Sequence, residues 1–405
     1  MPATLATRCC IAGGGPAGMM LGFLLARAGV ETVVLEKHAD FLRDFRGDTI
    51  HPSTINLMNE LGLLDEFLRL PHQRVEKLAG WFGGLRATIA DFTALPPPGR
   101  YIAMMPQWNF LDFLAGKARA FKPFTLLMRT EARSLIEEAG VVAGVNAVGP
   151  DGAIAIRADL TIAADGRHST LRGAAGLKSR DLGAPMDVLW FGVPRVPEDS
   201  AETLGRFDAG RIFIRINRGD YWQCGYVIAK GGFDDVKARG LDAFRADVAR
   251  LMELPLERLA LIATFDDVKL LTVSVDRLER WRRPGFLAIG DAAHAMSPVG
   301  GVGINLAVQD AVAAANQLAA PLLARKVSEA DLAAIERRRT WPAKATQFAQ
   351  VMIQNNVIAP TLGRSGPLRP PLFFRLVARY GRLSRLLGRA IGLGVRPEHV
   401  RTPST

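Results

Sequence analysis

Glycine, proline and acidic residues recur in three segments of the chain, in patterns that could bind a phosphorylated ligand. The first segment, GGGPAG, fits the pattern GxGxxG through Gly13, Gly15 and Gly18. The first glycine permits a tight turn, the second lets backbone approach a pyrophosphate, and the third lets a helix pack closely on a strand. Pro16 and Ala17 then open a helix whose N-terminal N–H groups and dipole favour phosphate. This segment therefore predicts a pyrophosphate site.

An acid stands where a ribose would need one. Glu36 lies near the end of the β-branched run ETVVLEK and follows Gly18 by 18 residues. A carboxylate at the end of the second strand of a βαβ unit can accept hydrogen bonds from ribose hydroxyls. Glu36, with Lys37 beside it, is therefore a candidate for binding a dinucleotide. These residues alone do not separate FAD from NAD.

The second and third segments each place an acid at the end of an expected strand. In AADGRHSTLR, Asp165 and Gly166 end a strand, and His168, Ser169 and Arg172 begin a helix. Such an acid can hold a polyol hydroxyl, and a glycine-lined helix start lets a flat ring lie against backbone. The third segment, GDAAHAMSPVGGVGIN, contains Gly290, Asp291, Pro298, Gly300, Gly301, Gly303, Ile304 and Asn305.

The histidines and cysteines give no sign of a metal site or a disulfide framework. Cys9 and Cys10 are adjacent in an apolar run, Cys224 stands alone, and the six histidines lack metal-ligand spacing. His294, four residues after Gly290, is expected to make a structural hydrogen bond rather than to act in catalysis. We therefore predict no metal.

The positive charge is concentrated near the C-terminal end. The net charge is +11, and residues 364–401 hold nine Arg, no Lys and one acid, Glu398. Because the rest is nearly balanced, we do not expect a nucleic-acid partner. No apolar run is long enough to span a membrane, and a cytoplasmic location, with membrane contact as an open addition, is expected.

In this order, the three motifs resemble the fingerprints of the FAD-dependent aromatic hydroxylases typified by p-hydroxybenzoate hydroxylase, the group A flavoprotein monooxygenases. Gln107, at the start of a helix in YIAMMPQWNFLDFL, is a fourth match. The resemblance covers roughly residues 7–350 and is specific for the superfamily, not for a substrate. The family's serine in the first loop is replaced here by Ala17, which puts one polar contact in doubt.

The resemblance implies a role for each matched residue. Glu36 would bind the adenosine ribose, Asp291 the ribityl hydroxyls, and Arg46 would lie near the phosphates and ribityl chain. Gln107 and Asp165 would also contact FAD, and His168 and Arg172 would lie near FAD or the pyridine nucleotide. Gly303, Ile304 and Asn305 would lie beside the flavin ring, and Gly290 would also bind the cofactor. Pro298, Gly300 and Gly301 would leave room above the ring, with Pro298 and Gly300 forming its catalytic environment.

The expected fold is α/β, a Rossmann-like FAD-binding domain with an inserted β-sheet substrate domain and a helical C-terminal segment. Helices are expected near 16–29, 108–121, 303–324 and 328–350. The FAD-binding domain would comprise residues 1–75, 99–182 and 277–358. The substrate domain would comprise 76–98 and 183–276, and 359–405 a linker and a basic amphipathic helix.

The function that the resemblance implies is hydroxylation of an aromatic or polyketide-like small molecule. NADH or NADPH would reduce FAD, and O₂ would react through a flavin hydroperoxide. The alternatives are a reductase or dehydrogenase of the same fold, similar to geranylgeranyl reductases, an NAD-dependent Rossmann dehydrogenase, and a non-catalytic membrane-peripheral flavoprotein. A halogenase is disfavoured because the sequence has no WxWxIP segment.

The sequence leaves two regions open to more than one interpretation. Trp190, Phe213, Arg215, Tyr221 and Gln223 are candidates for substrate contact, but a buried core or a solvated sheet face would explain them as well. The basic helix expected at 372–391 would either touch an anionic membrane or pack on the protein with its arginines in solvent. The sequence does not specify the oligomeric state.

Overall fold

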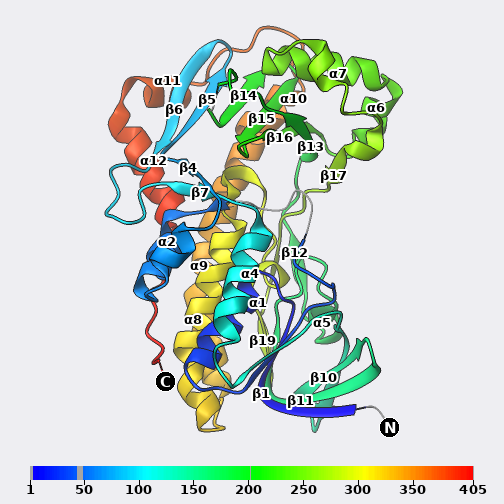
Figure 1. Cartoon of the computed structure of the whole chain (residues 1–405), viewed down its shortest axis with the longest axis vertical. Helices are drawn as coiled ribbons and strands as arrows, with labels where there is room; N and C mark the ends of the chain where they lie inside the picture. The colour runs from blue at the N-terminus through cyan, green and yellow to red at the C-terminus, as the bar shows by residue number, and fades with distance from the viewer. Residues whose placement is uncertain (1–2, 43–48, 201, 405) are drawn as a thin grey trace.

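The structure, a computed structural model, describes residues 3–42, 49–200 and 202–404. Its two large sheets lie at opposite ends of an elongated molecule, and long helices run between them (Figure 1). The first sheet has the order β19-β20-β11-β1-β2-β8, with β10 and β9 added along β11. The expected α/β fold is confirmed.

Parallel strands form the centre of the first sheet, and those in its middle end in residues that are buried on both faces. These strands are β1 (Ala3–Ala12), β2 (Thr32–Leu35), β8 (Phe124–Leu127), β11 (Gly152–Ala163) and β20 (Phe286–Ala288). Antiparallel strands complete it: β9 (Glu131–Glu138), β10 (Val141–Gly149) and β19 (Arg282–Arg283).

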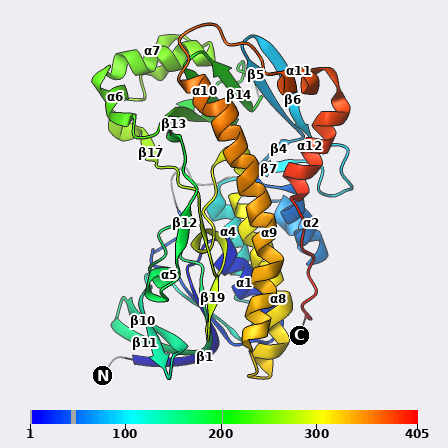
Figure 2. The ribbon, with the colours of Figure 1, turned by 180° about the vertical axis from the view of Figure 1, so that it is seen from behind.

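Helices cover this sheet and are held to it by small and apolar residues. α1 (Pro16–Arg27) is buried over most of its length because it packs against α4 (Gln107–Ala118) and α8 (Gly303–Leu323). α9 (Glu329–Ile353) lies beside α8 and runs most of the length of the molecule (Figure 2). The smaller helices are α2 (Pro52–Glu60), α3 (Leu64–Leu68) and α5 (Thr170–Ala174).

The second sheet has seven strands in the order β17-β13-β16-β15-β14-β5-β6. β15 and β16 form the hairpin expected around NRGD, and β5 and β6 join from a segment earlier in the chain. The bounds are β5 (Lys77–Phe82), β6 (Leu85–Asp91), β13 (Met186–Pro194), β14 (Leu204–Asp208), β15 (Arg211–Asn217), β16 (Tyr221–Ala229) and β17 (Lys269–Leu271).

The two faces of the second sheet have different neighbours. One face packs on α6 (Phe233–Ala238) and α7 (Leu241–Met252), with short helices η1 (Leu256–Leu259) and η2 (Phe265–Asp267) nearby. The other face packs on Ile358 and Leu362, which follow α9 in the chain, and on Val299. We call these the outer and the inner face.

Two small sheets join the domains. They are β3 (Thr49–Ile50), β7 (Ile102–Met104) and β4 (Gln73–Val75), and the pair β12 (Ser179–Asp181) and β18 (Asp276–Leu278). Short helices η3 (Gly290–Ala292) and η4 (Val299–Gly301) follow β20, and a π-helical turn, η5 (Gln354–Ile358), continues α9 into α10 (Ala359–Leu362).

The C-terminal region differs from the single helix expected at 372–391. Two helices, α11 (Leu372–Arg379) and α12 (Gly381–Leu393), meet at Tyr380, whose extended backbone ends the first helix. Both lie against β6, and Gly388 fits there because a Cβ would come within 2.1 Å of the Asp91 carbonyl oxygen. The residues that follow, 395–404, form an extended strap. No helix in the described ranges is long and apolar enough to cross a membrane.

Candidate FAD site

The three motifs meet because their strands end in register. Ala12 of β1 pairs with Leu35 of β2 and with Ala163 of β11, and Ala163 pairs with Ala288 of β20. Each motif follows directly after one of these residues. In an open parallel sheet, the carboxyl edge of the strands is where ligands bind.

The first glycine loop combines two packed glycines with one open one. A Cβ on Gly13, whose φ is +109°, would lie 2.2 Å from the Ala164 carbonyl oxygen, and a Cβ on Gly18 would lie 1.9 Å from the Gly13 oxygen. A Cβ on Gly15, by contrast, would meet nothing within 4 Å. Gly13 and Gly18 therefore close the turn, and Gly15 leaves space at the N-terminus of α1.

Glu36 is fixed by backbone at the end of β2. Its buried carboxylate accepts the N–H of Gly14 at 3.1 Å and the N–H of His38 at 3.0 Å. These bonds hold the carboxylate against the glycine loop, where a ribose would bind. Lys37 points into solvent.

The second segment, AADGRHSTLR at residues 163–172, is called the DG segment here and contains a buried oxygen without a hydrogen-bond partner among the described residues. Oδ2 of Asp165 accepts the N–H of Leu171 at 3.2 Å, while Oδ1 has no hydrogen-bond partner among the described residues. Burial raises the pKa of Asp165. Ser169 caps α5 by accepting the N–H of Arg172 at 3.0 Å. An unpaired buried acceptor fits a ligand hydroxyl.

The arginines of the DG segment form ion pairs with acidic side chains of the same protein. Arg172 contacts both oxygens of Asp276, at 3.1 and 3.3 Å, and the carbonyl of Arg167 at 2.7 Å. Arg167 in turn lies 3.4 Å from Asp291, a partly exposed carboxylate. The Arg172 guanidinium therefore serves to join α5 to β18, and His168 beside it is exposed.

The turn at Gly290 and Asp291, called the GD turn, is held by Asp310, a buried acid that the sequence motifs did not include. The N–H of Gly290 donates to Oδ2 of Asp310 at 3.1 Å, and Nε2 of His294 lies 2.5 Å from the same oxygen. Nε of Arg339 donates to Oδ1 at 2.8 Å. Burial by itself would raise the pKa of Asp310, but His294 and Arg339 hold it below its ordinary value. His294 thus makes the expected structural contact.

The strap extends this buried network to the far end of the chain. Arg339 Nη1 lies 3.3 Å from Oε1 of Glu398, and Arg338 Nε lies 2.6 Å from the same oxygen. The N–H of Glu398 donates to the side chain of Gln309. The carboxylate of Glu60 accepts the N–H of Val400 at 2.8 Å. The strap therefore links α2, α8 and α9.

The loop before α8 is bare backbone held from two sides. Gly300 and Gly301 have φ values of +80° and +62°, which favour glycine, and a Cβ on Gly303 would meet nothing within 4 Å. The Asn305 side chain accepts the N–H of His51 at 2.9 Å and donates to the Thr49 carbonyl at 3.2 Å. Its amide therefore positions β3 and α2.

On the other side, a row of glutamines on α9 and the first residue of η5 forms hydrogen bonds with the segments around this loop. Gln347 donates to the carbonyls of Asp276 and Ala295, at 2.7 and 3.0 Å. Gln350 donates to the carbonyls of Ser297 and Val299, both at 2.9 Å, and Gln354 donates to the Ser297 hydroxyl at 2.8 Å. One turn of helix separates successive glutamines, so all three face the loop.

The remaining residues that we predicted for this site have varied positions. Ala17 packs against Gly290, since a Cβ on Gly290 would lie 3.0 Å from the Ala17 methyl group. Gln107 is the first residue of α4, Ile304 is buried at the start of α8, and Pro298 precedes η4. Arg46 lies outside the described residues.

These features fit FAD. An open glycine at a helix N-terminus suits a pyrophosphate, two acids and an unpaired acceptor suit hydroxyls, and a glycine-lined helix start suits a flat ring. The sequence profile described as FAD binding domain matches residues 6–349.

The chain belongs to this family, and within it to the FAD-dependent monooxygenases. It is 33% identical over 371 residues to 6-methylpretetramide 4-monooxygenase of Streptomyces rimosus, covering 90% of this chain and 87% of that one. It is 28% identical to rifampicin monooxygenase of Streptomyces venezuelae, but spans only 61% of its length. PqsL, a probable FAD-dependent monooxygenase from Pseudomonas aeruginosa, has the same fold, with a TM-score of 0.74, 21% identity and 88% and 98% coverage.

In this monooxygenase, the two faces of the second sheet separate the substrate candidates. Trp190 and Val299 both pack against the apolar cluster of the inner face, and Gly225 lies beneath the Trp190 ring, since a Cβ there would come within 3.1 Å of it. Strand register places Tyr221 and Gln223 on this face also. Phe213 is buried on the outer face against α7, and Arg215 lies over Trp222 there. Phe213 and Arg215 therefore lie on the face of the sheet opposite to Trp190, Tyr221 and Gln223.

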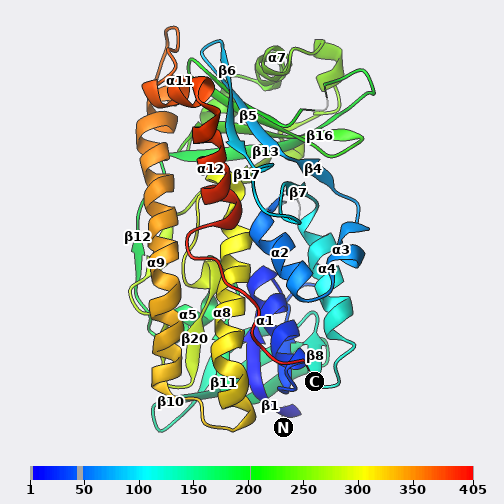
Figure 3. The ribbon, with the colours of Figure 1, turned by 90° about the vertical axis from the view of Figure 1, so that its left-hand side faces the viewer.

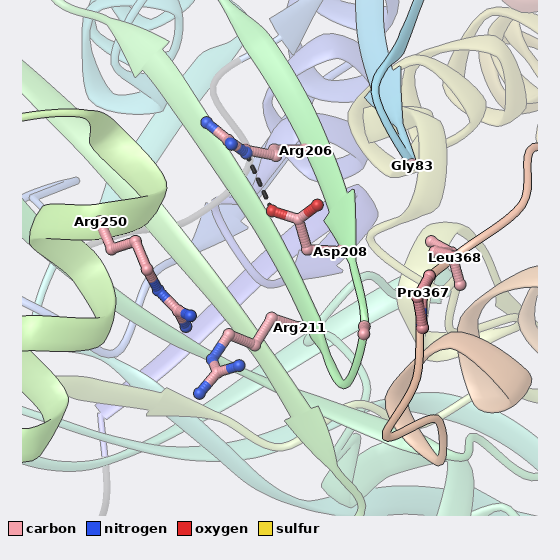
Figure 4. Close-up of a pocket in the computed structure, with 8 residues that line it drawn as sticks. Gly83, Arg206, Asp208, Arg211, Arg250, Pro367 and Leu368 are labelled. Atoms are coloured by element: carbon pink, nitrogen blue, oxygen red, sulfur yellow. Dashed lines mark hydrogen bonds and ion pairs between the residues drawn. The ribbon is translucent and has the colours of Figure 1, made fainter.

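A pocket of about 290 Å³ at the β14–β15 turn lies apart from the FAD motifs (Figure 4). Its arginines are paired with acids. Arg206 lies 3.0 Å from Asp208, and Arg211 and Arg250 lie 2.8 and 3.1 Å from Asp247. Arg239 also lies 3.0 Å from Asp247, so three arginines share this one carboxylate.

The sequence motifs did not reveal the residues that hold the backbone of the site in place. These residues are Asp310, Arg339, Glu398 and the three glutamines. The sequence did contain a signal for Asp310. This acid lies in the apolar helix α8, and a buried acid is rarely without a partner. No group of His, Cys, Asp and Glu that could hold a metal occurs among the described residues.

Proposed function

We propose that this monooxygenase hydroxylates a flat, largely apolar aromatic compound of the polyketide class, using FAD, O₂ and NADH or NADPH. The observation that carries the proposal is the 33% identity to 6-methylpretetramide 4-monooxygenase over 90% of the chain. Bound FAD would supply the redox and oxygen chemistry.

Particular residues would hold the cofactor. Gly15 and the N-terminus of α1 would bind the pyrophosphate, Glu36 the adenosine ribose, and Asp165 and Asp291 hydroxyl groups of the ribityl chain. Gly300, Gly301 and Gly303 would lie along the ring, with the N-terminus of α8 stabilising negative charge on it. Gln107, Lys37 and Arg46 remain candidates for contacts with FAD, and His168 for a contact with the pyridine nucleotide.

The inner face of the second sheet supports the choice of substrate class. Its residues around Trp190 are mostly apolar, and the same cluster includes Val299 in the loop assigned to the flavin ring. An aromatic polycycle could lie between this face and the ring, shielded from water. Tyr221 and Gln223, on the same face, would provide polar contacts.

The test is an absorption spectrum of the purified protein, followed by NADH or NADPH oxidation in air with a panel of tetracyclic phenols and single-ring phenols. We expect a flavin spectrum, substrate-stimulated oxygen uptake, and a product heavier by one oxygen atom. A flavin protein that reduces the substrate without consuming oxygen would instead indicate a reductase. A protein that takes up no FAD would overturn the proposal.

A further inference from the structure

One continuous stretch of the chain is basic and free of acids. Residues 337–397 contain twelve Arg and Lys and no Asp or Glu. This stretch forms most of α9 and all of α10, α11 and α12, and α9, α11 and α12 lie along one side of the molecule (Figure 3). We call this side the basic face.

Large apolar side chains on α9 are exposed to solvent. Trp341, Phe348 and Met352 are 57%, 70% and 49% exposed. Their spacing of seven and four residues puts them in one row along the helix. The opposite side of α9 carries the glutamines that hold the FAD-site loop, so the helix cannot turn to bury the row. Such a row on a monomer marks a surface of interaction.

The next helices repeat this combination. α11 buries Phe374 and Val377 against the protein, while Leu372, Phe373 and Leu376 are exposed. Arg375 and Arg379, also exposed, stand among these apolar residues. On α12, Leu386 is exposed together with Arg382, Arg385 and Arg389. Outward apolar residues with interspersed arginines are typical of helices that lie in a membrane interface.

We propose that the basic face docks on an anionic lipid bilayer. The exposed apolar side chains would enter the boundary between headgroups and acyl chains, and the guanidinium groups would bind lipid phosphates. A two-fold dimer through this face would bring the exposed arginines of α11 and α12 against their copies, and Asp91, 3.9 Å from Arg385, would offset only part of this charge. Nucleic acid would use the cations but would leave the row on α9 in water.

The experiment is co-sedimentation of the FAD-loaded protein with vesicles. One set is phosphatidylcholine alone, and the other is two parts phosphatidylcholine to one part phosphatidylglycerol. We expect binding to the anionic set, weakened by salt. Because a cation near such a surface contributes about fivefold in affinity, the double variant Arg375→Gln and Arg379→Gln should bind roughly 30-fold more weakly. Phe348→Ser should also weaken binding.

Matched controls change exposed residues on other surfaces. Arg133→Gln, on β9, and Leu261→Ser, after η1, should bind like the unmodified protein. All variants should retain FAD, which shows that they are folded. The proposal is overturned if the anionic vesicles bind no protein, if the control variants lose as much binding as the test variants, or if duplex DNA binds and vesicles do not.

Trp341 gives an independent readout, because its exposed indole should enter the lipid. Anionic vesicles should shift the tryptophan emission to shorter wavelength. Trp341→Phe should abolish the shift while keeping most of the binding. Binding without any shift in the unmodified protein would place the contact elsewhere and would also overturn the proposal.

Discussion

Nε of Arg339 lies 2.8 Å from Oδ1 of Asp310, at a point where neither side chain is more than 1% exposed. The other oxygen of Asp310 accepts the N–H of Gly290, the glycine of the GD turn. A buried ion pair thus supports the backbone where the ribityl end of FAD is proposed to bind. Removing one partner of such a pair leaves an uncompensated charge in the interior.

Arg339→Leu should therefore destabilise the protein by about 3–5 kcal/mol and weaken FAD binding. Unfolding by urea and titration with FAD would measure the two effects. The matched control is Arg337→Leu, because Arg337 is exposed two residues away on the same helix. If both variants kept normal stability and FAD affinity, the ion pair would have no role in supporting the turn.

The glycines of the first loop should separate folding from cofactor binding. Gly15→Val places its side chain in open space, so the apoprotein should lose no more than about 1 kcal/mol, the cost of a poor helix N-cap. It should nevertheless bind no FAD, because the side chain occupies the space proposed for the pyrophosphate. Gly18→Ala, by contrast, should unfold more easily even without FAD. Normal FAD binding by Gly15→Val would remove this loop from the site.

Asp291→Ala should lower the affinity for FAD by about tenfold, the effect of losing one hydrogen bond to a charged group. Equilibrium dialysis followed by the flavin spectrum would measure the affinity. Asp151→Ala, a change in an exposed turn, is the control. A fully loaded and active Asp291→Ala protein would contradict the ribityl assignment.

Burial lowers the pKa of His51 from 6.5 to about 4, even though Nδ1 lies 3.0 Å from the Ile391 carbonyl. The folded state therefore holds this ring neutral, while the unfolded chain takes up a proton near pH 6.5. Stability should be complete above that pH and should fall by up to about 3 kcal/mol between pH 6.5 and 4. His51→Asn, which can keep the donor to Ile391, should reduce this slope in urea titrations. An unchanged slope would assign the acid sensitivity to other groups.

Variants of Trp190 and Phe213 test whether the substrate binds at the inner face of the second sheet. Trp190→Ala should raise the KM for the aromatic substrate by at least tenfold, because a ring that stacks on it loses its contact, with little change in FAD affinity. Phe213→Leu should leave KM unchanged and cost about 1 kcal/mol of stability, as expected for a core residue. The opposite pattern would place the substrate on the outer face.

Local motifs predicted much of this structure because their physical requirements are local. Gly13 and Gly18 must be glycine where strand and helix touch, and the strand ends carry Glu36, Asp165 and Asp291 to one edge. Alternation along a strand such as β15 defined two faces, but it could not show which one α7 would cover, so Phe213 of β15 and Trp190 of β13 looked equivalent.

Contacts between distant segments could not be predicted in this way. Nothing near Arg339 in the sequence indicates that its partners are Asp310 and Glu398. The break at Tyr380 depends on how α11 and α12 fit against β6, so periodicity alone gave one helix where there are two.

The strap affects the order in which contacts of the folded protein can form during synthesis. A ribosome completes the glycine loop, the DG segment and the GD turn before it reaches Glu398. Until Glu398 has left the exit tunnel, Arg339 lacks the carboxylate that it contacts in the folded protein, and α2 and α8 are not yet joined by the strap. The nascent chain can therefore form the βαβ unit early, but it can close the buried charge network only after the segment that carries Glu398 has been translated.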